Sequence, residues 1–301
     1  MLRSKTQPYG KKVEAFCPPM PSATLLVSCP DQKGLVAKLS SFIYSYGGNI
    51  IHADHHTDPE AGLFLSRIEW DLEGFQLERG EIVPAFSGIA RGIQANWELH
   101  FSDTRRRIAL WASKQSHCLL DLIWRQRAGE LPAEIPLIIS NHPDLESVAR
   151  SFGIDYYHIP VSPEGKAAAE ARQLALLQEY RIDLVVLAKY MQVLSGSLLR
   201  QAPPVINIHH STLPAFAGAN PYHRAHQRGV KIIGATAHYA TEDLDEGPII
   251  EQDVVRVSHR DTVADIVRKG RDMERLVLAR AVRYHLENRV LVYHNKTVVF
   301  A

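Results

Sequence analysis

Three polar residues in the second half of the chain have the types and spacing for acyl chemistry: Asn207, His209 and Asp245. Asn207 and His209 belong to the alternating stretch 205–209 and, being two apart on a predicted strand, face the same side. An amide can donate a hydrogen bond to a carbonyl oxygen that is becoming negative, while an imidazole takes or gives the proton. Asp245 lies in a predicted turn, where its charge would favour the imidazolium and hold one tautomer. Together they predict chemistry at a carbonyl carbon.

The segments around these residues predict an α/β domain. Short apolar strands alternate with helical segments from residue 108 onward, which is typical of a mostly parallel sheet with ligands at the carboxyl ends of its strands. Asn207 and His209 end one of these strands, where that rule places a site. The predicted strands are 108–112, 137–140, 184–187, 205–209, 232–239 and 249–257, the helices 119–127, 145–152, 166–180 and 263–287, and a closing pair of strands covers 290–293 and 298–300.

The first third of the chain predicts a separate, smaller domain. Its predicted elements are strand 24–29, helix 35–46, strands 49–57 and 63–71, helix 78–94 and strand 97–101. The order βαββαβ is that of the ferredoxin-like unit. Because a polar run, 102–106, separates the two patterns, we predict an extension over 1–21, a first domain over 22–103 and a second over 104–301.

Three motifs of the second domain carry a family resemblance. The motifs are Asn207-x-His209-x-Ser211-x-Leu213-Pro214, then Gly234-x-Thr236-x-His238, then Leu244-Asp245-x-Gly247-Pro248-Ile249-Ile250. In this order they resemble the superfamily of formyltetrahydrofolate-dependent formyltransferases and hydrolases, which implies a Rossmann-like formyltransferase-type domain. The resemblance implies that Asn207, His209 and Asp245 are the catalytic residues. Segment 187–195 is similar to the one that holds the pterin ring largely through backbone groups, which implies a folate site at Tyr190, Met191, Gln192, Val193, Leu194 and Gly247.

The loop after the first strand of this domain distinguishes branches of the superfamily. Glycinamide ribonucleotide formyltransferases carry a Gly/Ser-rich loop there, whose amides hold the substrate phosphate. This chain has Leu110-Trp111-Ala112-Ser113-Lys114-Gln115-Ser116-His117-Cys118-Leu119 instead and resembles the deformylase branch. That resemblance implies hydrolysis of 10-formyltetrahydrofolate to tetrahydrofolate and formate, which supplies formate for purine synthesis and balances the one-carbon pool, with no cofactor besides the substrate. Thr212, where that branch carries a larger hydrophobic residue, is a departure that bears on pocket shape.

The first domain carries a second resemblance. Asp31-x-x-Gly34, the helix after it and Gly47-Gly48-Asn49-Ile50 resemble an ACT regulatory domain, which often binds amino acids at an interface between copies. This implies an effector site at Asp31, Gly34, Asn49 and Ile50 for a small amino acid such as glycine or methionine, and a homo-oligomer. Two alternatives stay open: a formyltransferase that passes the formyl group to an amine, and a binding protein that senses folate and an amino acid.

Bulk composition excludes several classes of partner. A net charge of +1 gives no electrostatic case for nucleic acid or a membrane surface, and no run of about 20 apolar residues predicts a membrane span. The three cysteines have no CxxC spacing, which favours a reducing cytoplasm. Residues 1–21 lack the apolar core of a signal peptide, so we expect a flexible extension there.

For several other polar residues, a structural role competes with a functional one. His209 and His210 are neighbours on a strand and should diverge, and His223-x-x-His226 has no evident acidic or cysteine partner, so we expect no metal site. For His117-Cys118 we expect inert packing, because sequence neighbours on a helix seldom face each other. His238 and Thr236 share a strand face, and site lining and core packing are equally good interpretations of both.

Overall fold

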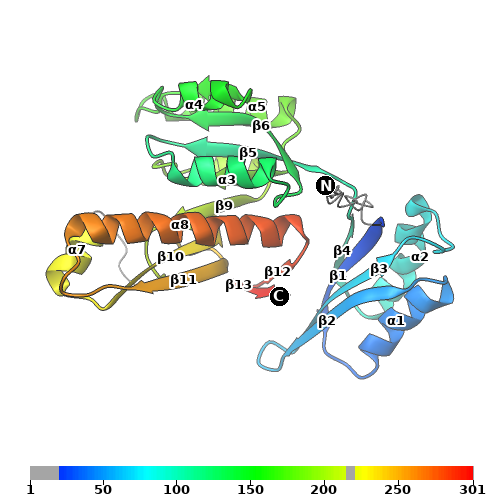
Figure 1. The fold of residues 1–301 in the computed structure, drawn as a ribbon. Helices are drawn as coiled ribbons and strands as arrows, with labels where there is room; N and C mark the ends of the chain where they lie inside the picture. The colour runs from blue at the N-terminus through cyan, green and yellow to red at the C-terminus, as the bar shows by residue number, and fades with distance from the viewer. Residues whose placement is uncertain (1–19, 215–220, 301) are drawn as a thin grey trace, which may run out of the picture.

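The computed structural model describes residues 20–214 and 221–300, which form two domains around two sheets (Figure 1). In the first domain, four antiparallel strands in the order β2-β3-β1-β4 carry two helices on one face. Its elements are β1 (Ser22–Pro30), α1 (Leu35–Ser45), β2 (Ile50–Asp58), β3 (Leu63–Asp71), α2 (Arg79–Gly92) and β4 (Asn96–Phe101). The predicted ferredoxin-like order is therefore confirmed.

Helix α1 forms where apolar residues recur at helical spacing. Leu35, Leu39, Phe42 and Ile43 are all buried against the sheet, where Ile68 and Trp70 complete the core. The helix ends because the chain turns into the left-handed region at Gly47, whose φ is 73°, a conformation that glycine adopts without steric cost.

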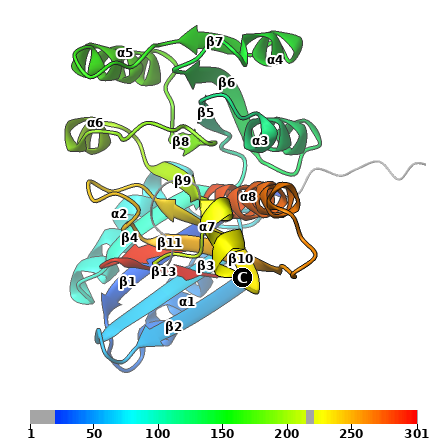
Figure 2. The ribbon, with the colours of Figure 1, turned by 90° about the vertical axis from the view of Figure 1, so that its left-hand side faces the viewer.

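The second domain contains a seven-stranded sheet in the order β11-β10-β9-β8-β5-β6-β7. The five strands from β9 to β7 are parallel, and β10 and β11 extend the sheet antiparallel, which confirms the predicted mostly parallel α/β architecture. Helices α3, α4 and α8 cover one face, and α5 and α6 cover the other (Figure 2). The elements are β5 (Arg106–Ala112), α3 (His117–Arg127), β6 (Ala133–Ser140), α4 (Glu146–Ser151), β7 (Asp155–His158), α5 (Lys166–Glu179), β8 (Leu184–Leu187), α6 (Gly196–Gln201), β9 (Val205–His209), α7 (Pro221–Arg228), β10 (Ile232–Tyr239), β11 (Ile249–Arg256), α8 (Val263–Leu286), β12 (Val290–Tyr293) and β13 (Lys296–Val299).

The strand order fixes where a ligand can enter the parallel part of the sheet. From β5 the chain runs outward through β6 and β7, then crosses back to β8 and β9 on the other side. The order therefore reverses between β5 and β8, and open α/β sheets bind ligands at such a reversal, beyond the carboxyl ends of the strands. Three elements were not predicted: β7, α6 and α7. In β7 and α6, four to six residues are too few to show a period.

The C-terminal hairpin joins the domains. Strands β12 and β13 lie beside the first sheet, where Leu291 and Phe300 pack against Leu26 and Leu65 (Figure 1). Because these residues come from both ends of the chain, the part of the second face formed by β1 and β3 is covered only when the whole chain is folded.

A polar chain crosses the same domain boundary, and it begins at His100 of β4, whose Nδ1 lies 3.2 Å from Arg106 Nη2. The guanidinium of Arg106 donates to His285 Nε2 over 3.0 Å, and His285 Nδ1 lies 2.7 Å from the hydroxyl of Tyr239. Burial and the nearby Arg106 lower the pKa of His285 to about 3, so the ring is neutral and Nε2 can accept. Tyr239 is thereby held from the side of the first domain, next to the strand position that enters the site described below.

Candidate active site

The structure brings the three predicted acyl-chemistry residues to one cavity of about 310 Å³. Asn207 and His209 come from the carboxyl end of β9, and Asp245 comes from the loop between β10 and β11. His209 Nδ1 lies 3.1 Å from Asp245 Oδ2. The arrangement joins residues that are 36 positions apart in sequence, and it places them at the sheet end where ligands are expected.

His209 is the residue best placed to move a proton. Its side chain is only 6% exposed, and its Nε2 is buried without a hydrogen-bond partner among the residues that the structure describes. Because a carboxylate only accepts, Nδ1 carries the hydrogen, and a neutral ring therefore presents a bare Nε2. A buried, unpartnered nitrogen in a cavity wall is a group that a ligand or a water would satisfy.

His238 orients the amide of Asn207. The antiparallel register of β9 and β10 sets the two residues opposite each other, and His238 Nε2 lies 3.2 Å from Asn207 Nδ2. His238 Nδ1 lies 2.9 Å from the carbonyl oxygen of Tyr239, so Nδ1 must donate, and Nε2 of the neutral ring accepts from the amide. The amide nitrogen of Asn207 is thus fixed toward His238, and its second N–H remains for a ligand.

Asp245 is an ionised carboxylate at neutral pH. The hydrogen bond from His209 holds the pKa of Asp245 well below its usual range. Asp245 has a positive φ of 59°, which aspartate tolerates better than most residues, and this backbone conformation directs the loop into the cavity.

The predicted folate segment lines the same cavity. Residues 190–194 connect β8 to α6, and among the described residues no hydrogen bond occupies the backbone groups of Gln192, Val193 or Leu194. Met191 and Val193 are 62% and 55% exposed, large values for apolar side chains, whereas Tyr190 packs inward with its hydroxyl bonded to Gln173. Free backbone groups beside exposed apolar side chains suit a flat heterocycle.

Gly247 stays a predicted folate contact, and the structure shows another reason for a glycine at this position. It is absent from the cavity lining, and a Cβ there would overlap the backbone oxygen of Tyr239. The physical need for glycine is therefore close backbone packing of the turn that carries Asp245. Thr212 also lies outside the lining, since its methyl group faces Gly234, so it does not shape the pocket directly.

Two histidine interpretations change with the structure. His209 and His210 do not diverge: both line the cavity, and their rings stack with centroids 4.6 Å apart. Strand alternation fails here because β9 ends at His209. On β10, Thr236 is fully buried and bonds to the carbonyl oxygen of Ser211, so it packs in the core, whereas His238 lines the site.

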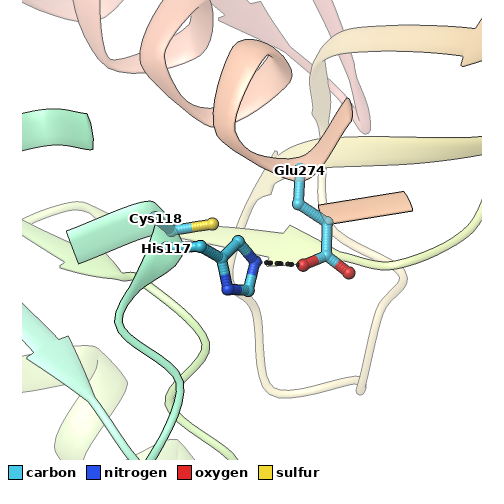
Figure 3. Close-up of side chains that lie close together, drawn as sticks. All are labelled: His117, Cys118 and Glu274. Carbon is cyan, nitrogen blue, oxygen red and sulfur yellow. Dashed lines mark hydrogen bonds and ion pairs between the residues drawn. The ribbon is translucent and has the colours of Figure 1, made fainter. Parts of the chain in front are cut away.

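A second polar cluster lies behind the cavity, at the start of α3. His117 Nε2 donates to Glu274 Oε2 over 2.6 Å, with Cys118 alongside (Figure 3). Glu274 also accepts from Lys189 Nζ at 3.2 Å and from the Tyr222 hydroxyl at 2.7 Å. His117 therefore has a specific partner that its local sequence did not indicate, while Cys118 packs in the core as expected.

The cluster's chemistry does not fit a metal ion. One donor atom of each of His117, Cys118 and Glu274 lies within 4.8 Å of the others. Burial, with a smaller effect of Glu274, raises the pKa of the Cys118 thiol well above its usual value, so the metal-binding thiolate is disfavoured. Burial alone would raise the pKa of Glu274, but the His117 hydrogen bond and the Lys189 charge lower it to about 2, so its charge is already paired.

The predicted effector residues fall into two groups. Asp31 and Gly34 lie where β1 meets α1, and Asn49 and Ile50 lie where α1 meets β2. Measured along β3, the two groups are seven residues apart, roughly 24 Å. One copy of the chain therefore does not bring all four together. Predictions that concern residues 1–19 or 215–220 lie outside the described residues.

Comparison with known proteins agrees with this architecture. The formyl transferase family model matches residues 106–282, and the ACT domain model matches residues 23–90. Formyltetrahydrofolate deformylase of Synechocystis sp. is 66% identical over 93% of this chain and 99% of its own length. The crystal structure of a formyltetrahydrofolate deformylase from Pseudomonas syringae pv. tomato has a TM-score of 0.92 and 49% identity, covering 95% of this chain and 96% of that one. Glycinamide ribonucleotide transformylase 1 from Symbiobacterium toebii has a TM-score of 0.62 and 34% identity, and it covers 68% of this chain and 98% of its own.

Proposed function

This chain belongs to the formyltetrahydrofolate deformylase family, and on that premise we propose that it hydrolyses 10-formyltetrahydrofolate to tetrahydrofolate and formate. The observation that carries the proposal is the unpartnered Nε2 of His209, which is backed by Asp245 and lies in a cavity wall shared with Asn207. The reaction needs only the folate and water. We further propose that the formate released serves purine synthesis and the balance of one-carbon units.

The first proposed step is attack by water on the formyl carbon. The water oxygen forms a bond to that carbon, and His209 Nε2 takes a proton from the water, while Asp245 stabilises the imidazolium through Nδ1. The formyl oxygen becomes negative and accepts the second N–H of Asn207, whose first N–H is turned toward His238.

The second proposed step is collapse of the tetrahedral intermediate. The bond between the formyl carbon and N10 breaks, and its electron pair stays on N10. The imidazolium of His209 returns the proton to N10, so that tetrahydrofolate and formic acid form, and the acid ionises in solution. General acid help of this kind contributes roughly 10² to 10⁴ in rate. The residue that receives the proton in the first step thus supplies it in the second.

Incubation of the purified protein with 10-formyltetrahydrofolate alone tests this proposal. We expect equal amounts of tetrahydrofolate and formate to appear, because no acceptor other than water is required. Tetrahydrofolate is followed by absorbance and formate by a coupled assay. Two results together would contradict hydrolysis and favour a formyltransferase. No formate would form without an added amine, and a formylated amine would form when amines are supplied.

We also propose that a small amino acid, such as glycine or methionine, modulates turnover through the first domain. Asp31 with Gly34 and Asn49 with Ile50 would share one site only across two copies of the chain, so the proposal includes a homo-oligomer. The exposed edge strand β2 suits such pairing, since an unpaired edge can accept a second chain. A cytoplasmic location, which the free thiols of Cys29 and Cys118 fit, is part of the same proposal.

The effector proposal predicts that glycine or methionine changes kcat or KM of the wild type and that Asp31→Asn weakens this response. Asp31 is exposed and distant from the cavity, so the basal rate should not change. Asp272→Asn, which alters an exposed carboxylate on α8, is the control and should keep the response. Kinetics that ignore every amino acid tested would contradict the proposal.

No helix in the described part of the chain has both the length and the apolar character needed to cross a membrane.

A further inference from the structure

The catalytic residues have an open cavity on one side and packed protein side chains on the other, near the ends of β5 and β8. The cavity is lined by the end of β8 with the loop after it, Leu199 of α6, the end of β9 and residues of the segment 238–245. Among the described residues, none of its lining comes from α3, α7 or α8. That unlined side is where the strand order reverses, between β5 and β8, and where this class of fold ordinarily leaves a crevice for ligand.

Two sets of contacts fill that crevice. At its base, Ser113 at the end of β5 ties down the loop after β8: its N–H donates to the carbonyl of Lys189, and its Oγ accepts from the N–H of Met191. Above it, the carboxylate of Glu274 is 1% exposed and accepts from Lys189, His117 and Tyr222. The reversal point therefore holds protein side chains where a crevice would otherwise be.

The side chains that fill this crevice are in contact with His209 through His210 and Tyr222. The ring of His209 stacks on that of His210, and the Tyr222 ring lies 6.2 Å from His210 with its hydroxyl on Glu274. Gly270 on α8 makes room for this arrangement, because a Cβ there would overlap the Tyr222 ring. Both carboxylate oxygens of Glu274 are hydrogen-bonded, and the neighbouring side chains pack around its ion pair with Lys189. A fully satisfied buried network of this kind is rigid.

We infer that the buried cluster of Glu274, Lys189, His117 and Tyr222 fills the acceptor side of the site, so that water alone reaches the formyl carbon. The inference rests on the proposed function and adds which residues make the enzyme use water, and not an amine, as the acceptor of the formyl group. The structural neighbour from Symbiobacterium toebii, named for glycinamide ribonucleotide, shares the fold but is named for a larger acceptor. The reaction stays balanced if an amine enters: its nitrogen bonds to the formyl carbon, the bond to N10 breaks, and the amine's proton ends on N10.

Competition between water and an amine tests the inference. Glycinamide serves as the probe, and the products formate and formylglycinamide are separated and counted. Wild type should give formate alone. His117→Ala and Tyr222→Ala each remove a side chain from the cluster, and each should raise the formylglycinamide fraction by at least about tenfold over background, since pocket volume discriminates at this level.

Matched variants separate filling from charge and hydrogen bonding. Tyr222→Phe keeps the ring but loses the hydroxyl, and Glu274→Gln keeps the shape but loses the charge, so both should still give formate alone. Formylglycinamide from wild type, or formate alone from folded and active alanine variants, would overturn the inference. A wild type that releases no formate would instead contradict the proposed function.

A second measurement covers alanine variants that lose turnover. Cys118 is fully buried beside His117 and Glu274, so iodoacetamide should not label it in the folded wild type. In folded His117→Ala or Tyr222→Ala, peptide mapping should show labelling of Cys118, because the space beside it has opened. Failure to label Cys118 in both variants would count against a filled subsite, as would equal labelling in Tyr222→Phe.

Discussion

Replacing His209 by alanine is expected to lower kcat by about 10² to 10⁴ while 10-formyltetrahydrofolate still binds. The imidazole lines the cavity and has a buried nitrogen without a hydrogen-bond partner among the described residues, and Asp245 fixes which nitrogen that is. Binding should persist because the folate segment 190–194 is held by other contacts, including that of Ser113 with Met191. Steady-state kinetics give kcat, and equilibrium dialysis of the variant gives the dissociation constant.

His259→Ala is the matched control, because that histidine is exposed in a turn outside the cavity. It should leave kcat unchanged. A His209→Ala variant that turns over normally would show that the proton is carried by another group. Loss of folate binding together with turnover would indicate that His209 serves binding instead.

Gly247→Ala is expected to destabilise the fold by about 3 kcal/mol or more and to lower kcat as well. The added Cβ would overlap the backbone oxygen of Tyr239, and a backbone atom cannot rotate away as a side chain can. The turn would have to move, and Asp245 lies two residues before it with the carboxylate that holds His209. Urea unfolding measures the first effect, and the assay of formate release measures the second.

Gly92→Ala provides the comparison for this change. Gly92 ends α2, and a Cβ there would meet no atom within 4 Å, so its unfolding midpoint should match that of wild type or rise slightly. An unchanged midpoint for Gly247→Ala would mean that the turn can relax, and that glycine is required there for another reason.

The sequence was informative wherever a pattern is local and long. The periodic apolar residues of α1 and the run that forms α8 specify their elements directly, and the alternation through β9 places Asn207 and His209 on one face. Asp245 can be joined to them because a turn between two predicted strands can face the end of the sheet, and the family resemblance agrees. No local pattern connects a loop with a strand 36 residues earlier, so the distance between them could not be predicted.

The remainder of the site depends on tertiary packing. His238 meets Asn207 through the register between two strands, and a shift of one residue would have turned it away. His117 and Glu274 are 157 positions apart and touch only because α3 and α8 pack on the same face of the sheet. His210 departed from its prediction since the strand that would have directed it outward stops one residue earlier.

The C-terminal hairpin limits how freely the two domains can be exchanged in evolution. Leu291 and Phe300, near the last residue, seal the sheet that begins at Ser22. A gene fusion or loss that brought in or removed the first domain alone would leave an apolar surface on both products. We therefore expect the two domains to behave as one cooperative body, and recombination between family members should succeed only when it exchanges both ends at once.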